Sequence, residues 1–181
     1  KRLCQLSSDA QSLCVRVLAA LAECSVCCHI FAEGNYTDLA LFAVQRLSAD
    51  AIGGSGGVEH LLLTILAAVT TSPSVKDVFI GSEEIHNSSC NNDNKRISAI
   101  ISAIRQAGLE VVAGEMKRNR SVELALRTIQ YGFLTLHHIA SFGSKGCDIL
   151  RRMSAVRLCL DALTIIHAFM SRNKSETMGS M

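Results

Sequence analysis

Three short stretches of the chain share one pattern, and this repetition constrains the fold more than any other feature. Each places an aliphatic residue four positions before a small residue, and an amphipathic helical pattern follows each one: Ile30–Gly34, Ile104–Gly108 and Leu150–Ser154. A recurring helical unit that cannot bury its own apolar face must stack on its neighbours. The pattern therefore predicts an α-solenoid, a class of fold that usually works as an extended binding surface.

The composition favours helices throughout. The 181 residues are 49% hydrophobic but only 4% aromatic, with one Pro and no Trp, and no segment shows sustained strand alternation. Ala, Leu, Ile and Val at this content are typical of closely packed helices rather than of aromatic-rich β-sandwiches. We therefore expect an all-α protein with a substantial core.

The periodicity of apolar residues divides the chain into short and long helices. We expect helices over residues 9–23, 26–32, 38–47, 58–71, 95–107, 109–116, 121–140, 147–153 and 155–170, with a short segment of unassigned structure at 75–80. Ser7 or Ser8 can cap the first helix, and Gly34 suits a left-handed stop. Turns are expected at 51–57 and 143–146. The prediction is one solenoid over residues 1–170, with an inserted polar loop at about 82–94 and a polar tail at 171–181.

Longer motifs resemble armadillo-type repeats, whose units hold a short helix, a second helix and a long third helix. The best match is Gly108–Met116, followed by Ser121 and by Gln130–Ala140. Val17–Ala22 and Ile65–Thr70 fit the third-helix pattern, and their spacing agrees with the roughly 40 to 47 residues of such units. Gly34 and Gly108 lie 74 residues apart, which is not a whole number of units, so the resemblance requires an insertion of roughly 28 residues around Ser74–Asn94 or an omitted piece of chain. The resemblance implies a right-handed α-solenoid of about three to four armadillo-like repeats.

Related solenoids of the importin and catenin type bind extended peptides through a ladder of third-helix Asn residues. The matching positions in this chain are Ala20, Ala68 and His138. Two alanines offer no side-chain hydrogen bond, so this mode of binding does not carry over. We expect partners to bind helix faces or loops instead.

Basic residues gather in two places. Eighteen Lys and Arg against sixteen Asp and Glu leave a net charge of +2, which gives no support to nucleic-acid binding. If successive units stack in register, the two groups would line one edge and receive an acidic partner segment; the alternative is ordinary solvated helix ends. The candidate partner-binding residues are Lys117, Arg118, Arg120, Arg151 and Arg152.

Two clusters of side chains are candidates for metal binding or for acid–base catalysis. Cys24, Cys27, Cys28 and His29 are zinc-ligand types, but a structural zinc site normally pairs two separated ligand clusters, and we favour burial as small helix-packing residues. The pair His137–His138 could act as an acid–base set, yet no nucleophile motif accompanies it. We expect no enzyme activity, no metal and no cofactor.

The cysteines and the longest uncharged run bear on location. Most of the eight cysteines sit at apolar helical positions, where a free thiol behaves as a small hydrophobe. We expect a cytoplasmic protein, with cytoskeletal or ciliary placement left open. The uncharged run Thr128–Ser144 is shorter than the roughly 20 residues of a membrane span, so no span is expected.

The leading hypothesis is a non-enzymatic scaffold or adaptor that binds other proteins through solenoid helix faces. The alternative is a helical metal-dependent or enzymatic domain that uses the Cys24–His29 cluster or His137 and His138. A solenoid leaves apolar faces at both ends. We therefore predict that Asp9–Leu21 and Ala155–Phe169 are sticky end faces that can self-associate.

Overall fold

Helices account for every regular element that the structure describes. The computed structural model describes residues 7–53, 58–81, 90–114 and 120–178, which confirms the expected all-α class for these ranges. The elements in chain order are α1 (Ser8–Glu23), α2 (Cys28–Glu33), α3 (Thr37–Gly53), α4 (Glu59–Val69), the 3-10 helix η2 (Pro73–Val75), α5 (Lys76–Ile80), α6 (Cys90–Gly114), α7 (Arg120–Ser141), α8 (Ser144–Arg152) and α9 (Ala155–Met178).

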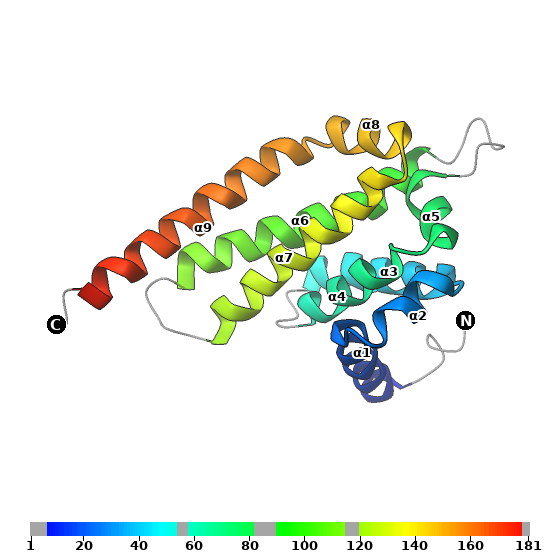
Figure 1. Cartoon of the computed structure of the whole chain (residues 1–181), viewed down its shortest axis with the longest axis horizontal. Helices are drawn as coiled ribbons and strands as arrows, with labels where there is room; N and C mark the ends of the chain where they lie inside the picture. The colour runs from blue at the N-terminus through cyan, green and yellow to red at the C-terminus, as the bar shows by residue number, and fades with distance from the viewer. Residues whose placement is uncertain (1–6, 54–57, 82–89, 115–119, 179–181) are drawn as a thin grey trace.

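The long helices lie in two rows. In one row α4 packs against both α1 and α7, and in the other α6 packs against both α3 and α9. The rows are joined because α3 packs on α4 and α6 packs on α7. In Figure 1 the layers run from α1 and α2 at one end, through α3 with α4 and α6 with α7, to α8 and α9 at the other. Helices α6 and α9 run in one direction, and α7 runs back between the two ends of the molecule.

The centre of the molecule is α4, which is buried on almost every side. Six consecutive residues from Leu62 to Ala67 are buried, and Leu62, Leu63, Ile65 and Leu66 are fully so. A helix that is apolar around its whole circumference must be enclosed by other helices. The continuous apolar sequence of this segment therefore fixes α4 as the core helix, with α1, α3 and α7 around it.

Residues with positive φ follow two of the short helices, α5 and α8. Gly81 follows α5 at φ 66°, and Ser154 follows α8 at φ 58°. Gly143, at φ 105°, separates α7 from α8. These left-handed conformations are easy for Gly and costly for Ser. They turn the chain between layers, so that the long helices α6 and α9 can lie side by side.

Gly108 lies inside one long helix and not at a boundary between two helices. Residues 95–107 and 109–116 were expected to form two helices, but α6 runs unbroken from Cys90 to Gly114 with Gly108 inside it. Gly108 is buried, and a Cβ atom there would lie 3.3 Å from the Ile165 Cδ1 atom of α9. The glycine therefore serves close packing between helices, and the prediction of a stop at this position is wrong.

Other boundaries shift by a few residues. The backbone at Gly34 is extended, at φ −83° and ψ 165°, so the expected left-handed stop is wrong; its carbonyl instead accepts a 2.7 Å hydrogen bond from the Ser72 hydroxyl. The expected loop over 82–94 is wrong from Cys90 onward, because α6 begins there and Asn and Asp suit a first helical turn. Residues 82–89 and 54–57 lie outside the described ranges. Gly146 lies within α8, and α9 continues through most of the polar tail to Met178. Ser7 caps α1 as expected.

Candidate functional site

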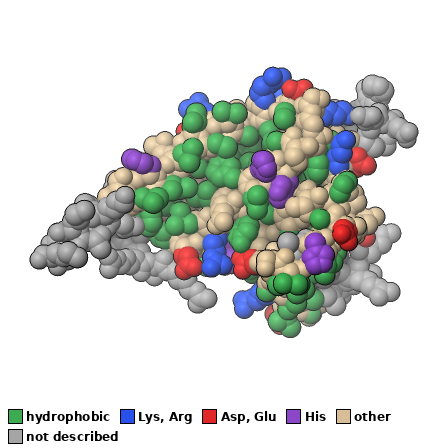
Figure 2. Space-filling view, viewed as in Figure 1, with side chains coloured by type: hydrophobic (Ala, Val, Ile, Leu, Met, Phe, Trp, Pro, Cys, Tyr) green, Lys and Arg blue, Asp and Glu red, His purple; other side chains and the backbone are tan. Residues whose placement is uncertain are grey.

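A groove lies between the last three helices of the part of the chain that the structure describes. It has a volume of about 550 Å³ and is lined by residues of α7, α8 and α9. Figure 1 shows α8 between the end of α7 and the start of α9. Figure 2 shows hydrophobic side chains gathered over this part of the surface. The residues that line it are Phe133, Leu136, His137, Ala140, Cys147, Leu150, Arg151, Ala155, Val156, Cys159, Ala162, Leu163 and Ile166.

The α9 wall is a stripe of exposed apolar side chains. Val156, Leu160 and Leu163 are 67%, 60% and 61% exposed, and they follow one another at steps of four and three residues. This spacing places them on one face of the helix, where Val156 and Leu163 line the groove. Leu158 is buried against the rest of the protein, and Ala162 is buried as well although it lines the groove. The helix is therefore apolar both toward the core and toward the groove.

The α7 wall has the same periodicity. Phe133, Leu136, His137 and Ala140 recur at steps of three, one and three residues, so that they too share one face. Leu136 is only 4% exposed and forms the floor, whereas His137 is exposed at the rim. Two facing helices with matched apolar stripes form a groove of the kind that a third helix fills in a bundle.

The part of the groove beside α8 carries a cation. Arg151 lines the groove and donates to the Asp148 carboxylate at 2.8 Å, and both side chains are largely exposed. The position of α8 depends on Gly146, because a Cβ atom there would overlap the Ile139 carbonyl oxygen of α7. Glycine thus permits the contact that brings Arg151 to the groove.

Two thiols face the groove from different helices. Cys147 on α8 is exposed, and Cys159 on α9 is half-buried among the lining residues. Burial raises the pKa of the Cys159 thiol, because the apolar surroundings disfavour the thiolate. The reactivity of these two thiols therefore indicates whether a bound molecule covers the groove.

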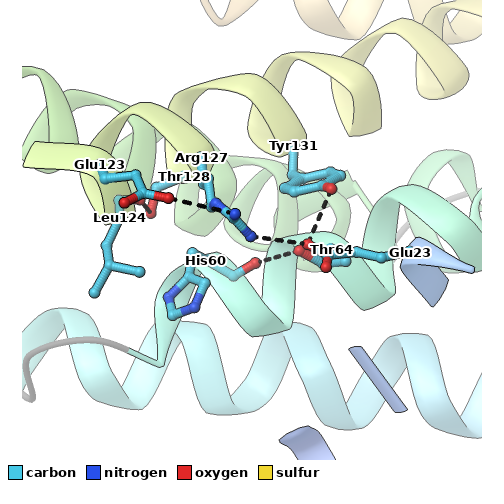
Figure 3. Close-up of polar contacts among 8 residues, drawn as sticks. All are labelled: Glu23, His60, Thr64, Glu123, Leu124, Arg127, Thr128 and Tyr131. Carbon is cyan, nitrogen blue, oxygen red and sulfur yellow. Dashed lines mark hydrogen bonds and ion pairs between the residues drawn. The ribbon is translucent and has the colours of Figure 1, made fainter. Parts of the chain in front are cut away.

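A polar cluster links α1 to α7 on another part of the surface (Figure 3). The Glu23 carboxylate accepts a hydrogen bond from the Tyr131 hydroxyl at 3.1 Å and pairs with Arg127 at 3.4 Å. Arg127 also pairs with Glu123 at 3.4 Å. Burial and then the bond to Glu23 raise the pKa of Tyr131. Because the charged groups are nearly half exposed, each pair contributes little stability, but together they orient α1.

His138 is half-buried and contacts α4 rather than lining the groove. Its Nδ1 atom lies 2.9 Å from the Ala67 carbonyl oxygen and 3.1 Å from the Thr70 hydroxyl, both at the end of α4. Its ring centroid is 5.7 Å from that of His137, and the two rings are tilted by 54°. The structure thus divides the histidine pair, with His137 at the groove rim and His138 in a helix–helix contact.

The basic residues that the sequence singled out fall at different places. Arg120 begins α7, whereas Arg151 and Arg152 end α8, beyond the other end of α7. Since a helix of this length extends about 33 Å, these three residues do not form one edge. Lys117 and Arg118 lie outside the described residues, as does the side chain of Arg120. The spacing of apolar residues does not report this separation, which depends on the path of α7.

The cysteine-rich segment lies between α1 and α2. Hydrogen bonds from the backbone of Cys27, from the backbone of Val26 and from the Cys27 thiol lower the pKa of Cys24, the residue that ends α1. The side chain of Cys28 is not described. Among the side chains that are described, no group of three or more His, Cys, Asp and Glu residues is arranged to hold a metal ion.

Comparisons with protein-family models, curated proteins and solved structures found no match for the chain. Within the described ranges, no single helix is long and apolar enough to cross a membrane, although two bent helix pairs, α4 with η2–α5 and α8 with the first part of α9, reach the required length and composition. The fold and the site together define an all-helical protein with an apolar groove at one end of its helix rows.

Proposed function

We propose that the chain is a protein–protein interaction module without catalytic activity, which acts as a scaffold or adaptor by binding an amphipathic helix in the α7–α8–α9 groove. The observation that carries this proposal is the apolar lining on two facing helices, with Val156 and Leu163 more than half exposed. An amphipathic helix recognises such a groove by apolar anchors at every third or fourth residue.

Burial of the exposed stripe supplies the driving force. Complete burial of a Val or Leu side chain contributes about 1.5 to 3 kcal/mol, and the α9 side chains of Val156, Leu160 and Leu163 are largely unburied. The anchors of a partner helix would cover both walls at once. Loss of translational and rotational freedom on association offsets part of this gain.

The partner helix is expected to carry an acidic residue near α8. Arg151 lines the groove and Arg152 lies next to it, both exposed. The pair between Arg151 and Asp148 is exposed and therefore weak, so a partner carboxylate can compete for the guanidinium. The earlier candidates Lys117, Arg118 and Arg120 are not part of this basic site: Arg120 begins α7, and Lys117 and Arg118 lie outside the described residues.

The finer fold that we propose is a right-handed α-solenoid of three to four armadillo-like units. It is supported by the rows α1–α4–α7 and α3–α6–α9, and by the order of a short helix followed by two long ones in α2–α3–α4 and α5–α6–α7. A cytoplasmic setting is part of the proposal, since Cys14, Cys24, Cys27, Cys147 and Cys159 are free thiols.

The test is affinity capture from the native source with matched variants. The groove variant is Val156→Asp with Leu163→Asp, and the control is Leu109→Asp with Val112→Asp, a pair of comparable exposure on α6 outside the groove lining. We expect a helical partner that the control retains and the groove variant loses, and that protects Cys159 from alkylation. Arg151→Glu with Arg152→Glu should weaken its binding and reduce the salt dependence. Equal capture by both aspartate variants would contradict the proposal.

A further inference from the structure

Two apolar faces lie at opposite ends of the helix rows. One is the α7–α8–α9 groove, and the other is the outer face of α1, which appears as a second hydrophobic patch in Figure 2. Figure 1 places α1 and α9 in the two outermost layers. A protein that carries two such faces has the elements of a head-to-tail contact.

The α1 face has the pattern that the groove requires. Leu13, Val17 and Leu21 are 64%, 52% and 43% exposed and follow one another at four-residue steps. The opposite face holds α1 on α4 through the buried residues Val15 and Ala19. Between Leu13 and Ala22 the only charged residue is Arg16, so this helix presents an almost uncharged surface. Its stripe supplies apolar anchors at the spacing that a helix groove accepts.

The contacts of the other long helices indicate where α1 of another molecule would fit. Within the described chain α4 packs on α3, and α7 packs on α6, so that these two members of one row each have a partner in the other. The long helix α9 packs on α6, and the groove occupies the position beside α9 and α7 where a corresponding helix would lie. Together with the short helix α8 and the long helix α9, a helix in that position would form a unit of one short and two long helices. This unit would have the same order as α2–α3–α4 and α5–α6–α7.

We infer that the groove of one copy binds α1 of a second copy, with Leu13, Val17 and Leu21 against the walls formed by α7 and α9. This inference rests on the proposed function, because it names the helix that the groove takes. A helix that runs antiparallel to α9 has its C-terminal end beside α8. α1 has no basic residue in its last turn, so Arg151 of the neighbouring copy supplies the cation that a helix C-terminus favours.

The contact joins different surfaces on the two copies, so it does not close on itself as a two-fold dimer does. Each copy still has a free groove or a free α1 after the first contact forms. Such heterologous contacts produce open chains whose length increases with concentration. This separates the inference from α1–α1 or α9–α9 pairing, either of which stops at a dimer.

The test is analytical ultracentrifugation of the full 181-residue chain over a range of concentrations. Wild type should form a series of species that grows with concentration. An α1 variant, Leu13→Asp with Val17→Asp, and the groove variant, Val156→Asp with Leu163→Asp, should each lose all species above monomer. The control variant, Leu109→Asp with Val112→Asp, should behave as wild type. Circular dichroism must show the same helical content and unfolding for all four proteins.

The decisive measurement is the mixture of the two blocked variants. The α1 variant keeps an intact groove and the groove variant keeps an intact α1, so an equimolar mixture should form a one-to-one dimer and nothing larger. In this dimer Cys159 of the α1 variant should be protected from alkylation. No dimer in the mixture, or oligomers that persist in either variant alone, would overturn the inference.

The outcomes also separate this inference from the proposed function. A wild-type chain that stays monomeric while a helical partner is captured through the groove overturns the self-association but leaves the proposed function. If the groove variant changes neither the oligomers nor the capture of a partner, both the inference and the proposed function are overturned. Protection of Cys159 by a small apolar molecule, without oligomers, also contradicts the inference.

Discussion

The Nδ1 atom of His138 lies 2.9 Å from the carbonyl oxygen of Ala67, which joins α7 to the end of α4. A carbonyl oxygen only accepts, so the proton of this hydrogen bond is on Nδ1. The armadillo resemblance aligned His138 with a residue that binds peptide. In this protein its ring nitrogen contacts the neighbouring core helix, so His138 has a role in the packing of α7 on α4.

We predict that acid weakens the fold through His138. Burial is the main effect that lowers the pKa of His138, and the charge of His137 adds to it, while the bond to Ala67 opposes it. The unfolded chain then takes up its proton first, so the stabilising contribution is complete above about pH 6.5 and is lost as the pH falls through the folded pKa. Urea unfolding from about pH 8 to about pH 5 measures this loss.

The control for this prediction is His138→Asn, which keeps a hydrogen-bond donor near the Nδ1 position but does not titrate. The variant should lose less stability than wild type over the same pH range. An equal loss in the two proteins would assign the acid sensitivity to other groups.

We predict that Gly146→Ala is strongly destabilising, because its Cβ atom overlaps the backbone carbonyl of Ile139 and α8 must move. The expected cost is about 1 to 3 kcal/mol, as for other overpacked sites. Gly108→Ala is the matched change, since its Cβ meets only the end of the Ile165 side chain at 3.3 Å and α6 gains helix propensity. Chemical unfolding should show Gly108→Ala close to wild type, and similar losses in the two variants would refute the assignment.

Leu136 and Leu134 provide a second matched pair. Leu136 is 4% exposed in the core and Leu134 is 40% exposed, two positions apart on α7. Leu136→Ala should reduce the free energy of unfolding by about 2 to 5 kcal/mol, and Leu134→Ala by about 0.5 kcal/mol or less. The measurement is the urea midpoint at constant slope. Comparable effects would mean that α7 packs through a different face.

We predict that Cys159 is alkylated slowly at neutral pH and that its reaction accelerates only as the pH rises above the ordinary range of a thiol. The reason is that burial raises the pKa of Cys159 and the thiolate is the reactive form. Mass spectrometry of the α1 variant, in which the groove stays open, gives the rate, and exposed Cys147 provides a reference for an accessible thiol. Equal rates at the two cysteines at neutral pH would contradict the prediction.

The sequence by itself determined the helical class and most of the helices. The apolar periodicity of α1, α4 and α7 is strong because each helix buries one face or more, and burial selects residues at three- and four-residue steps. Apolar side chains such as Leu13 and Leu163 are exposed, as expected for the end faces Asp9–Leu21 and Ala155–Phe169. Their association with partners remains a prediction.

Only the tertiary structure decided how the pieces come together. Gly108 has the sequence of a helix stop, yet it lies inside α6 because α9 packs closely there, and no local pattern reports a contact with Ile165. Arg120 and Arg151 look equivalent in sequence, but Arg120 is the first residue of α7 and Arg151 lies beyond the other end of that helix. The groove depends on the placement of α7, α8 and α9. Helix propensity is local, whereas the approach of two helices depends on the side chains of both, which are far apart in the sequence.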